Sequence, residues 1–98
     1  MGLASSSRGF LEQVIDFQIN QIKSNKSFYN DPEFKKIFQI TDVNDFVFGM
    51  IYGTIVDKFS TYFTTIYGRV PLQDEMKEIS DTVTKRLPDI KKAIYFEE

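Results

Sequence analysis

The sequence predicts an all-α protein, a compact bundle of four to five helices around a long central hydrophobic helix at about residues 42–68. Apolar residues recur at steps of three and four along nearly the whole chain, which is typical of helices with one buried face. No pair of alternating segments joined by a hairpin turn is found. With 98 residues and 42% hydrophobic content, the chain is long enough for one small core.

We expect a flexible N-terminal tail over residues 1–8 and a single helical domain over residues 9–98. The first helix is predicted at about residues 8–23. Its buried face follows the three-and-four spacing of Leu11, Val14, Ile15, Ile19 and Ile22. Residues 24–27 are short and polar, and they predict a loop because such side chains compete for backbone hydrogen bonds.

A short second helix is predicted to begin near Asp31. Asp31 suits the N-cap, Pro32 suits the first helical position, and Glu33 complements the positive end of the helix dipole. Phe34, Ile37 and Phe38 would form its apolar stripe. A break is expected at residues 39–41.

The third helix is the central one, and it should begin with Thr41 or Asp42 as its cap. Gly68 is a plausible C-terminal cap in the left-handed conformation. Apolar residues cover most of the helix circumference, as expected for the central helix of a bundle. One stripe contains Phe48, Ile51, Ile55, Phe59, Tyr62 and Ile66.

The fourth helix is predicted to start near Pro71, with a buried stripe of Leu72, Met76, Ile79 and Val83. Pro88 cannot donate a backbone hydrogen bond and disfavours helical angles at Leu87. Either the helix kinks there, or a fifth short helix starts with Pro88. Ile90 and Ile94 continue the apolar stripe, so we expect this last segment to be docked on the core.

Gly49 and Gly53 match the small-xxx-small pattern that lets two helices approach closely. Each costs about 1 kcal/mol relative to alanine in a helix interior. Three interpretations stay open: a homodimer seam or ligand groove, an internal crossing with another helix of the chain, or a solvent-facing edge.

Further interface candidates are Asp57, Tyr52, Phe28 and Tyr29. Asp57 is the lone acid in the middle of the central helix, and we expect it to mark a narrow exposed strip. If it were buried, it would need a partner such as Arg69 or Arg86. Phe28 and Tyr29 follow the first helix, and together with Tyr95 and Phe96 near the end they cannot all be at the centre of the core. An exposed aromatic patch would indicate an interface.

A local basic region contains Lys85, Arg86, Lys91 and Lys92. Residues 80–87 superficially resemble the recognition helix of a helix-turn-helix regulator, but no turn residue separates them from the preceding helical spacing. The four cations are consistent with an acidic partner or a few phosphates. They are equally consistent with cations placed near helix C-termini.

The segment Asp74-Glu75-Met76-Lys77-Glu78 has the form acid-acid-x-x-acid. It resembles the first half of the motif of all-helical MazG-type nucleotide pyrophosphohydrolases, and that resemblance implies carboxylates that hold Mg²⁺. The resemblance covers five residues and starts with Asp rather than Glu. The second acidic motif of that family has no match, since Glu97 and Glu98 have the wrong spacing. The helix dipole also explains Asp74 and Glu75.

Composition narrows the chemistry that the chain can perform. It contains no Cys and no His, which removes thiolate nucleophiles and the commonest general base and metal ligand. A net charge of −2 argues against nucleic acid as the partner, and no apolar run is long enough to span a membrane. We expect no metal and no cofactor.

The sequence therefore predicts a non-enzymatic cytoplasmic protein that acts as a protein–protein interaction or homo-oligomerisation module. The alternative is a small-ligand or nucleic-acid binding regulator that uses residues 80–92. A carboxylate–metal hydrolase is the third hypothesis.

Overall fold

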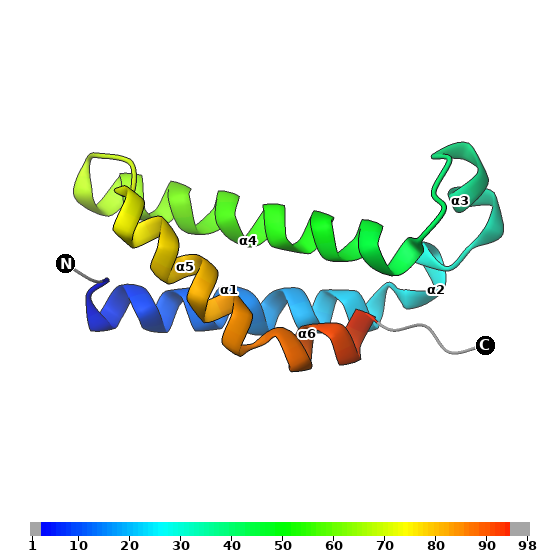
Figure 1. Ribbon diagram of the computed structural model, residues 1–98, viewed down its shortest axis with the longest axis horizontal. Coiled ribbons are helices and arrows are strands. Elements are labelled where there is room, and N and C mark those ends of the chain that lie inside the picture. Colours follow the sequence, from blue (N-terminus) through cyan, green and yellow to red (C-terminus); the bar gives the residue numbers. More distant parts are fainter. Residues whose placement is uncertain (1–2, 95–98) are drawn as a thin grey trace.

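The computed structural model describes residues 3–94, which form helices joined by short connections and contain no strand (Figure 1). The helices are α1 (Ser5–Ser24), α2 (Lys26–Tyr29), α3 (Pro32–Ile37), α4 (Val43–Tyr67), α5 (Gln73–Lys85) and α6 (Leu87–Ile94). The predicted all-α fold is confirmed. None of these helices combines the length and the apolar character that a bilayer crossing requires.

The two longest helices, α1 and α4, run antiparallel along the long axis of a molecule that measures 44 × 23 × 19 Å (Figure 1). Helix α5 crosses this pair obliquely, and α6 lies beside α1 and runs in the same direction. The strongest packing joins α1, α4 and α6 to one another. Helices α2 and α3 form one end of the molecule, and the α4–α5 turn forms the other.

The core lies where the apolar stripes of α1, α4, α5 and α6 meet. Phe59 is the largest fully buried side chain, and the isoleucines and valines around it come from all four helices. The predicted inner faces are confirmed for most residues, but Ile66 of the central stripe and Leu72 of the fourth predicted helix are 57% and 55% exposed. Buried apolar residues include Leu11, Ile15 and Ile22 from α1, Val47, Ile51 and Ile55 from α4, Ile79 and Val83 from α5, and Ile90 and Ile94 from α6.

The predicted central helix is confirmed as one uninterrupted element with the expected caps. The Asp42 carboxylate accepts a hydrogen bond from the backbone N–H of Asp45 at 3.1 Å. Gly68 ends the helix with φ of 70°, where a residue with a Cβ would be strained, and its N–H donates to the carbonyl of Thr64. At α3, Asp31 caps the helix and Pro32 follows it, as predicted.

The predicted boundary of the N-terminal tail is wrong for residues 3–8. Helix α1 begins at Ser5, and Leu3 is buried with its backbone N–H donating to Glu78 Oε1 at 2.7 Å. Ser7 is fully buried, and its Oγ lies 3.4 Å from the hydroxyl of Tyr67. Ser7 is small enough to be buried next to Tyr67 at the end of α4, and because serine is polar the apolar spacing of the sequence does not reveal this packing.

The connection at Pro88 takes the second of the two predicted forms. Helix α5 ends at Lys85, Arg86 serves as its cap, and a separate helix α6 begins at Leu87 with Pro88 in its first turn. Backbone N–H groups in the first turn of a helix have no hydrogen-bond partner within that helix. A proline at this position therefore removes no helical hydrogen bond. Ile90 and Ile94 are buried, so the expected docking of this segment is confirmed.

Replacing Phe59 with alanine is expected to destabilise the fold by about 3–5 kcal/mol, because it leaves a cavity where α1 and α4 meet. Urea unfolding followed by circular dichroism measures the change. Phe17→Ala is the matched control, because Phe17 is 54% exposed on α1, and we expect a change within about 0.5 kcal/mol. Equal losses in the two variants would contradict the assignment of the core.

Candidate functional site

The two glycines of α4 lie on the face that points away from the core. Gly49 and Gly53 are exposed, and a Cβ built at either position would meet no atom within 4 Å. The internal helix crossing that the sequence allowed is therefore wrong for residues 3–94. The glycines do not promote packing inside the described chain, and the homodimer seam, ligand groove and exposed edge remain.

The same face continues toward both ends of α4. Steps of three, four and four residues place Phe46, Gly49, Gly53 and Asp57 in one row, which we call the α4 stripe. Asp57 is exposed, so its predicted solvent-facing position is confirmed. Tyr52 is half-buried on a different side of α4, where its ring stacks on Phe48 with centroids 6.3 Å apart.

Aromatic rings gather at the α2–α3 end of the molecule. We call this set the aromatic end cluster; it consists of Phe28, Tyr29, Phe34, Phe38 and Phe46. The ring of Phe34 is central, with its centroid 4.8 Å from those of Phe28 and Phe38 and 6.0 Å from that of Phe46. The cluster is exposed at its rim, where Phe28 is 56% and Phe38 60% accessible.

The cluster depends on α2, a helical turn that the local sequence pattern does not predict. Residues 24–27 were expected to form a loop, whereas Lys26–Tyr29 are helical and direct Phe28 and Tyr29 toward α3. The Tyr29 hydroxyl reaches the sulfur of Met50 at 4.0 Å and so ties this turn to α4. The α3 stripe also differs from expectation, because Ile37 is 65% exposed.

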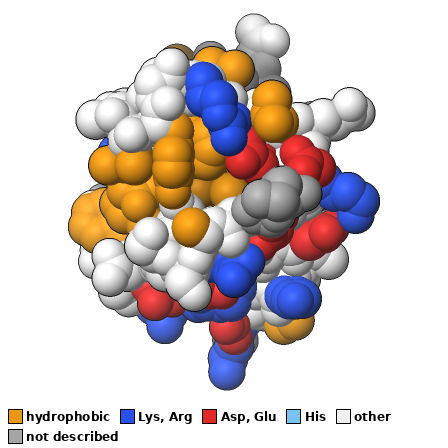
Figure 2. Space-filling model, turned by 90° about the vertical axis from the view of Figure 1, so that its left-hand side faces the viewer, with side chains coloured by type: hydrophobic (Ala, Val, Ile, Leu, Met, Phe, Trp, Pro, Cys, Tyr) orange, Lys and Arg blue, Asp and Glu red, His pale blue; other side chains and the backbone are white. Residues whose placement is uncertain are grey.

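A second apolar region lies at the opposite end of the molecule, around the α4–α5 turn. Figure 2 views this end, where hydrophobic side chains gather on one side and charged side chains on the other. We call the exposed apolar residues of this turn the turn patch: Ile66, Tyr67, Val70 and Leu72. It is separated from the aromatic end cluster by most of the length of α4.

The four predicted basic residues do not form one surface. The Nζ of Lys91 lies over the ring of Phe48, 4.4 Å from its centroid. Arg86 is held by carboxylates, and Lys85 is exposed in the last turn of α5. Only Arg86 and Lys92 border the same groove. Residues 80–92 therefore do not form a continuous cationic face.

Arg86 is the hub of an ion-pair network between α1 and the α5–α6 junction. Its guanidinium donates to Glu12 Oε1 at 2.5 Å, to Asp16 Oδ1 at 2.6 Å and to Asp89 Oδ2 at 3.3 Å. The hydrogen bond to Asp16, followed by the one to Glu12, raises the pKa of Arg86. This arginine is occupied in holding helices together.

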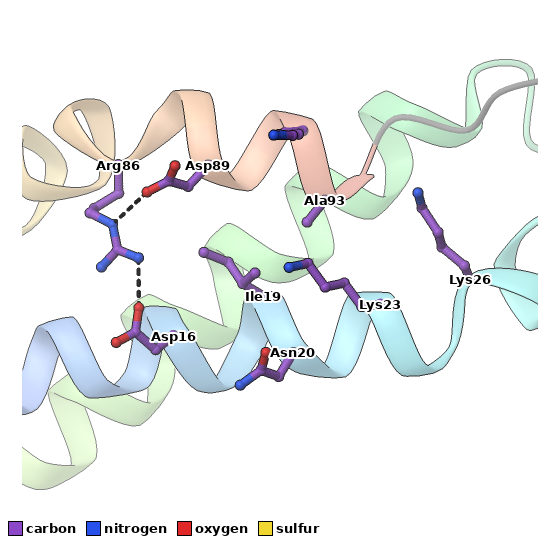
Figure 3. Close-up of a pocket in the computed structure, with 9 residues that line it drawn as sticks. Asp16, Ile19, Asn20, Lys23, Lys26, Arg86, Asp89 and Ala93 are labelled. Atoms are coloured by element: carbon purple, nitrogen blue, oxygen red, sulfur yellow. Dashed lines mark hydrogen bonds and ion pairs between the residues drawn. The ribbon is translucent and has the colours of Figure 1, made fainter.

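A groove of about 550 Å³ runs between α1 and α6, next to this network (Figure 3). Figure 3 shows Lys23 extending from α1 and Ala93 from α6 into the space between the two helices, with Arg86 at one end. Its lining consists of Asp16, Ile19, Asn20, Lys23, Lys26, Arg86, Asp89, Lys92 and Ala93. Most of these residues belong to α1 and α2 and lie outside the basic region that the sequence indicated. The sequence pattern did not indicate this groove, because α1 and α6 are distant in sequence.

The acidic segment of α5 is engaged in local structure. Arg69 donates to both carboxylate oxygens of Glu75, at 2.9 and 3.1 Å, and lowers the pKa of Glu75 from 4.5 to about 2. Glu78 accepts from Arg8 and from the backbone of Leu3. Within residues 3–94 no three acidic side chains gather as a cation site would require. Glu75 and Glu78 thus form ion pairs with arginines, whereas the resemblance to pyrophosphohydrolases implied that such carboxylates hold Mg²⁺.

Comparisons with protein-family models, with curated proteins and with solved structures gave no significant match to this chain.

Gly49→Ala and Gly53→Ala are each expected to raise the free energy of unfolding by about 1 kcal/mol, because the new methyl group meets open space and alanine favours helix. Chemical denaturation at low micromolar concentration measures this. Gly9→Ala in α1, where a Cβ also meets nothing within 4 Å, is the matched control with the same expected gain. A loss of stability confined to the α4 variants would contradict the exposed position.

Glu75 is expected to stabilise the fold in a pH-dependent manner. Its folded pKa of about 2 lies below the ordinary 4.5, so its contribution is complete above pH 4.5 and is lost as the pH falls toward 2. Unfolding of the wild type and Glu75→Gln should differ most at pH 6, and the gap should narrow on acidification. When Arg69 is replaced by Gln in both proteins, the difference in unfolding free energy should change less with pH, because the hydrogen bond that lowers the pKa of Glu75 is lost. A gap that is constant with pH would contradict the Arg69–Glu75 pairing.

Proposed function

We propose that this chain is a non-enzymatic helical interaction module that self-associates through the aromatic end cluster and the adjoining α4 stripe. The observation that carries the proposal is the exposed rim of the cluster. Phe28 and Phe38 contact other rings, yet more than half of each side chain is accessible. Contiguous exposed aromatic surface of this kind is typical of protein–protein interfaces.

The α4 stripe supports the same proposal from a second direction. Phe46 belongs to the cluster and also begins the row that continues through Gly49 and Gly53. The glycines cost helix stability, about 1 kcal/mol each, without any close packing inside the described chain. A helix from outside could approach the backbone of α4 closely at this point.

A second copy of the chain fits this surface best. In a two-fold symmetric dimer the same surface is used by both partners, so it must be complementary to itself. Two glycine rows can face one another across such an axis at a short interhelical distance. The flanking aromatic rings would then lose water from both copies, and apolar burial supplies the main driving force.

Sedimentation equilibrium up to high micromolar concentration tests the proposal. We expect reversible self-association that weakens at least ~10-fold in Phe38→Gln and in Gly53→Leu, with the helical circular dichroism signal retained. The lost apolar contact explains the first effect, and a side chain placed between the two helices explains the second.

Each variant has a matched control on α1. Phe17 is 54% exposed outside the cluster, and Gly9 is helical with open space around it. Phe17→Gln and Gly9→Leu should therefore leave association unchanged. A strict monomer at high micromolar concentration would rule out self-association. Equal effects of the α1 and α4 variants would assign the interface to another surface.

A further inference from the structure

We propose that the second copy binds in an antiparallel orientation, with the aromatic end cluster of one copy seated in a hollow of the other; this inference rests on the self-association proposed above. The hollow has a volume of about 450 Å³. We call it the acceptor hollow; it is lined by Phe10 of α1 and by Asp57, Lys58, Thr61 and Tyr62 of α4. A two-fold symmetric pair then contains two identical contacts, each between a cluster and a hollow.

The lining of the acceptor hollow suits an aromatic ring. The rings of Phe10 and Tyr62 are half-buried and stack with centroids 4.0 Å apart. A second hollow of about 290 Å³ shares Thr61 with the first, and its lining consists of small hydroxyl side chains: Ser60, Thr61, Thr64 and Thr65. Aromatic faces beside small side chains leave room for a phenylalanine of the other copy and offer it ring contacts.

The spacing along α4 matches the cluster to the hollow. When Gly53 meets Gly53 of the other copy in an antiparallel crossing, positions equally far from Gly53 on its two sides face one another. Phe46 precedes Gly53 by seven residues and Thr61 follows it by eight, which is about 10 and 12 Å along the helix. Phe46 of each copy therefore lies opposite the acceptor hollow, and Gly49 lies opposite Asp57.

The cluster and the hollow also lie on the same side of α4. The Tyr29 hydroxyl of the cluster contacts Met50, and steps of four, three and four residues lead from Met50 through Thr54 and Asp57 to Thr61. A two-fold axis that lies between antiparallel helices, perpendicular to them, keeps this side of both helices on the same side of the pair. The cluster of one copy is therefore turned toward the hollow of the other.

The charges of α4 favour the antiparallel orientation. Asp42, Asp45 and Asp57 are exposed, and a parallel two-fold pair would place each of them beside its own copy, which is unfavourable. In the antiparallel pair Asp42 and Asp45 face residues 58–67 of the other copy, where Lys58 is the only charged residue. The dipoles of the two α4 helices also run in opposite directions in this orientation.

Mixing two defective variants tests the contact between cluster and hollow. Phe38→Gln damages the cluster, and Thr61→Arg fills the hollow with a bulky charge. By sedimentation equilibrium, each variant alone should associate at least ~10-fold more weakly than the wild type, with the helical circular dichroism signal retained. The mixed dimer should be at least ~3-fold tighter than either variant alone, because it keeps one intact cluster–hollow contact of the two and neither variant alone keeps any.

Thr84→Arg is the matched control for Thr61→Arg, because Thr84 is an exposed threonine of α5 outside both hollows. It should leave association unchanged. Equal weakening by the control, or a mixture that associates no more tightly than its components, would overturn the contact between cluster and hollow.

Distances between spin labels in the associated chain test the orientation separately. The chain has no cysteine, so Asp45→Cys or Ile66→Cys introduces a single labelling site, eight or thirteen residues from Gly53. In the antiparallel pair the labelled positions should be about 24 and 39 Å apart along the helices, whereas a parallel pair gives short and similar distances for both. Similar distances would overturn this inference and leave self-association in place. A wild type that stays monomeric at high micromolar concentration would instead contradict the proposed function itself.

Discussion

The packing of α4 against α1 is the constraint on which the other features depend. Helix α4 has 25 residues and is apolar over most of its circumference, whereas α1, the next longest, has 20. Helix α1 can cover only one side of α4, and α6 packs against a further side of it. The side that no helix of the described chain covers carries Gly49, Gly53 and Asp57. The α4 stripe thus follows from an excess of apolar helix over available partners.

The apolar spacing of the sequence was sufficient to predict the helices that build the core. It identified most of the inner residues of α1, α5 and α6, because each has one narrow apolar face and therefore one way to be buried. Leu72, which was expected to begin the α5 stripe, is instead exposed at the α4–α5 turn. The spacing could not orient α4 in the same manner. When apolar residues surround a helix, spacing alone does not indicate which side meets the core, and Gly49 and Gly53 were equally compatible with an internal crossing.

Contacts between distant segments explain the remaining differences. Arg86 pairs with Glu12 and Asp16, and Arg8 pairs with Glu78, across at least 70 positions in each case. No local pattern predicts such pairs. They remove Arg86 from the basic region that the sequence suggested. Exposed pairs of this kind contribute little stability each, so their main effect is to fix how α5 and α6 lie on α1.

The unbroken course of α4 has a mechanical consequence for the whole molecule. At 1.5 Å per residue, a helix of 25 residues is roughly 37 Å long, most of the 44 Å length of the molecule. The aromatic end cluster and the turn patch are thus attached to one rod, with a set separation and a set rotational phase. One residue inserted into α4 would turn one end relative to the other by about 100°, so the length of this helix can change only in near-whole turns.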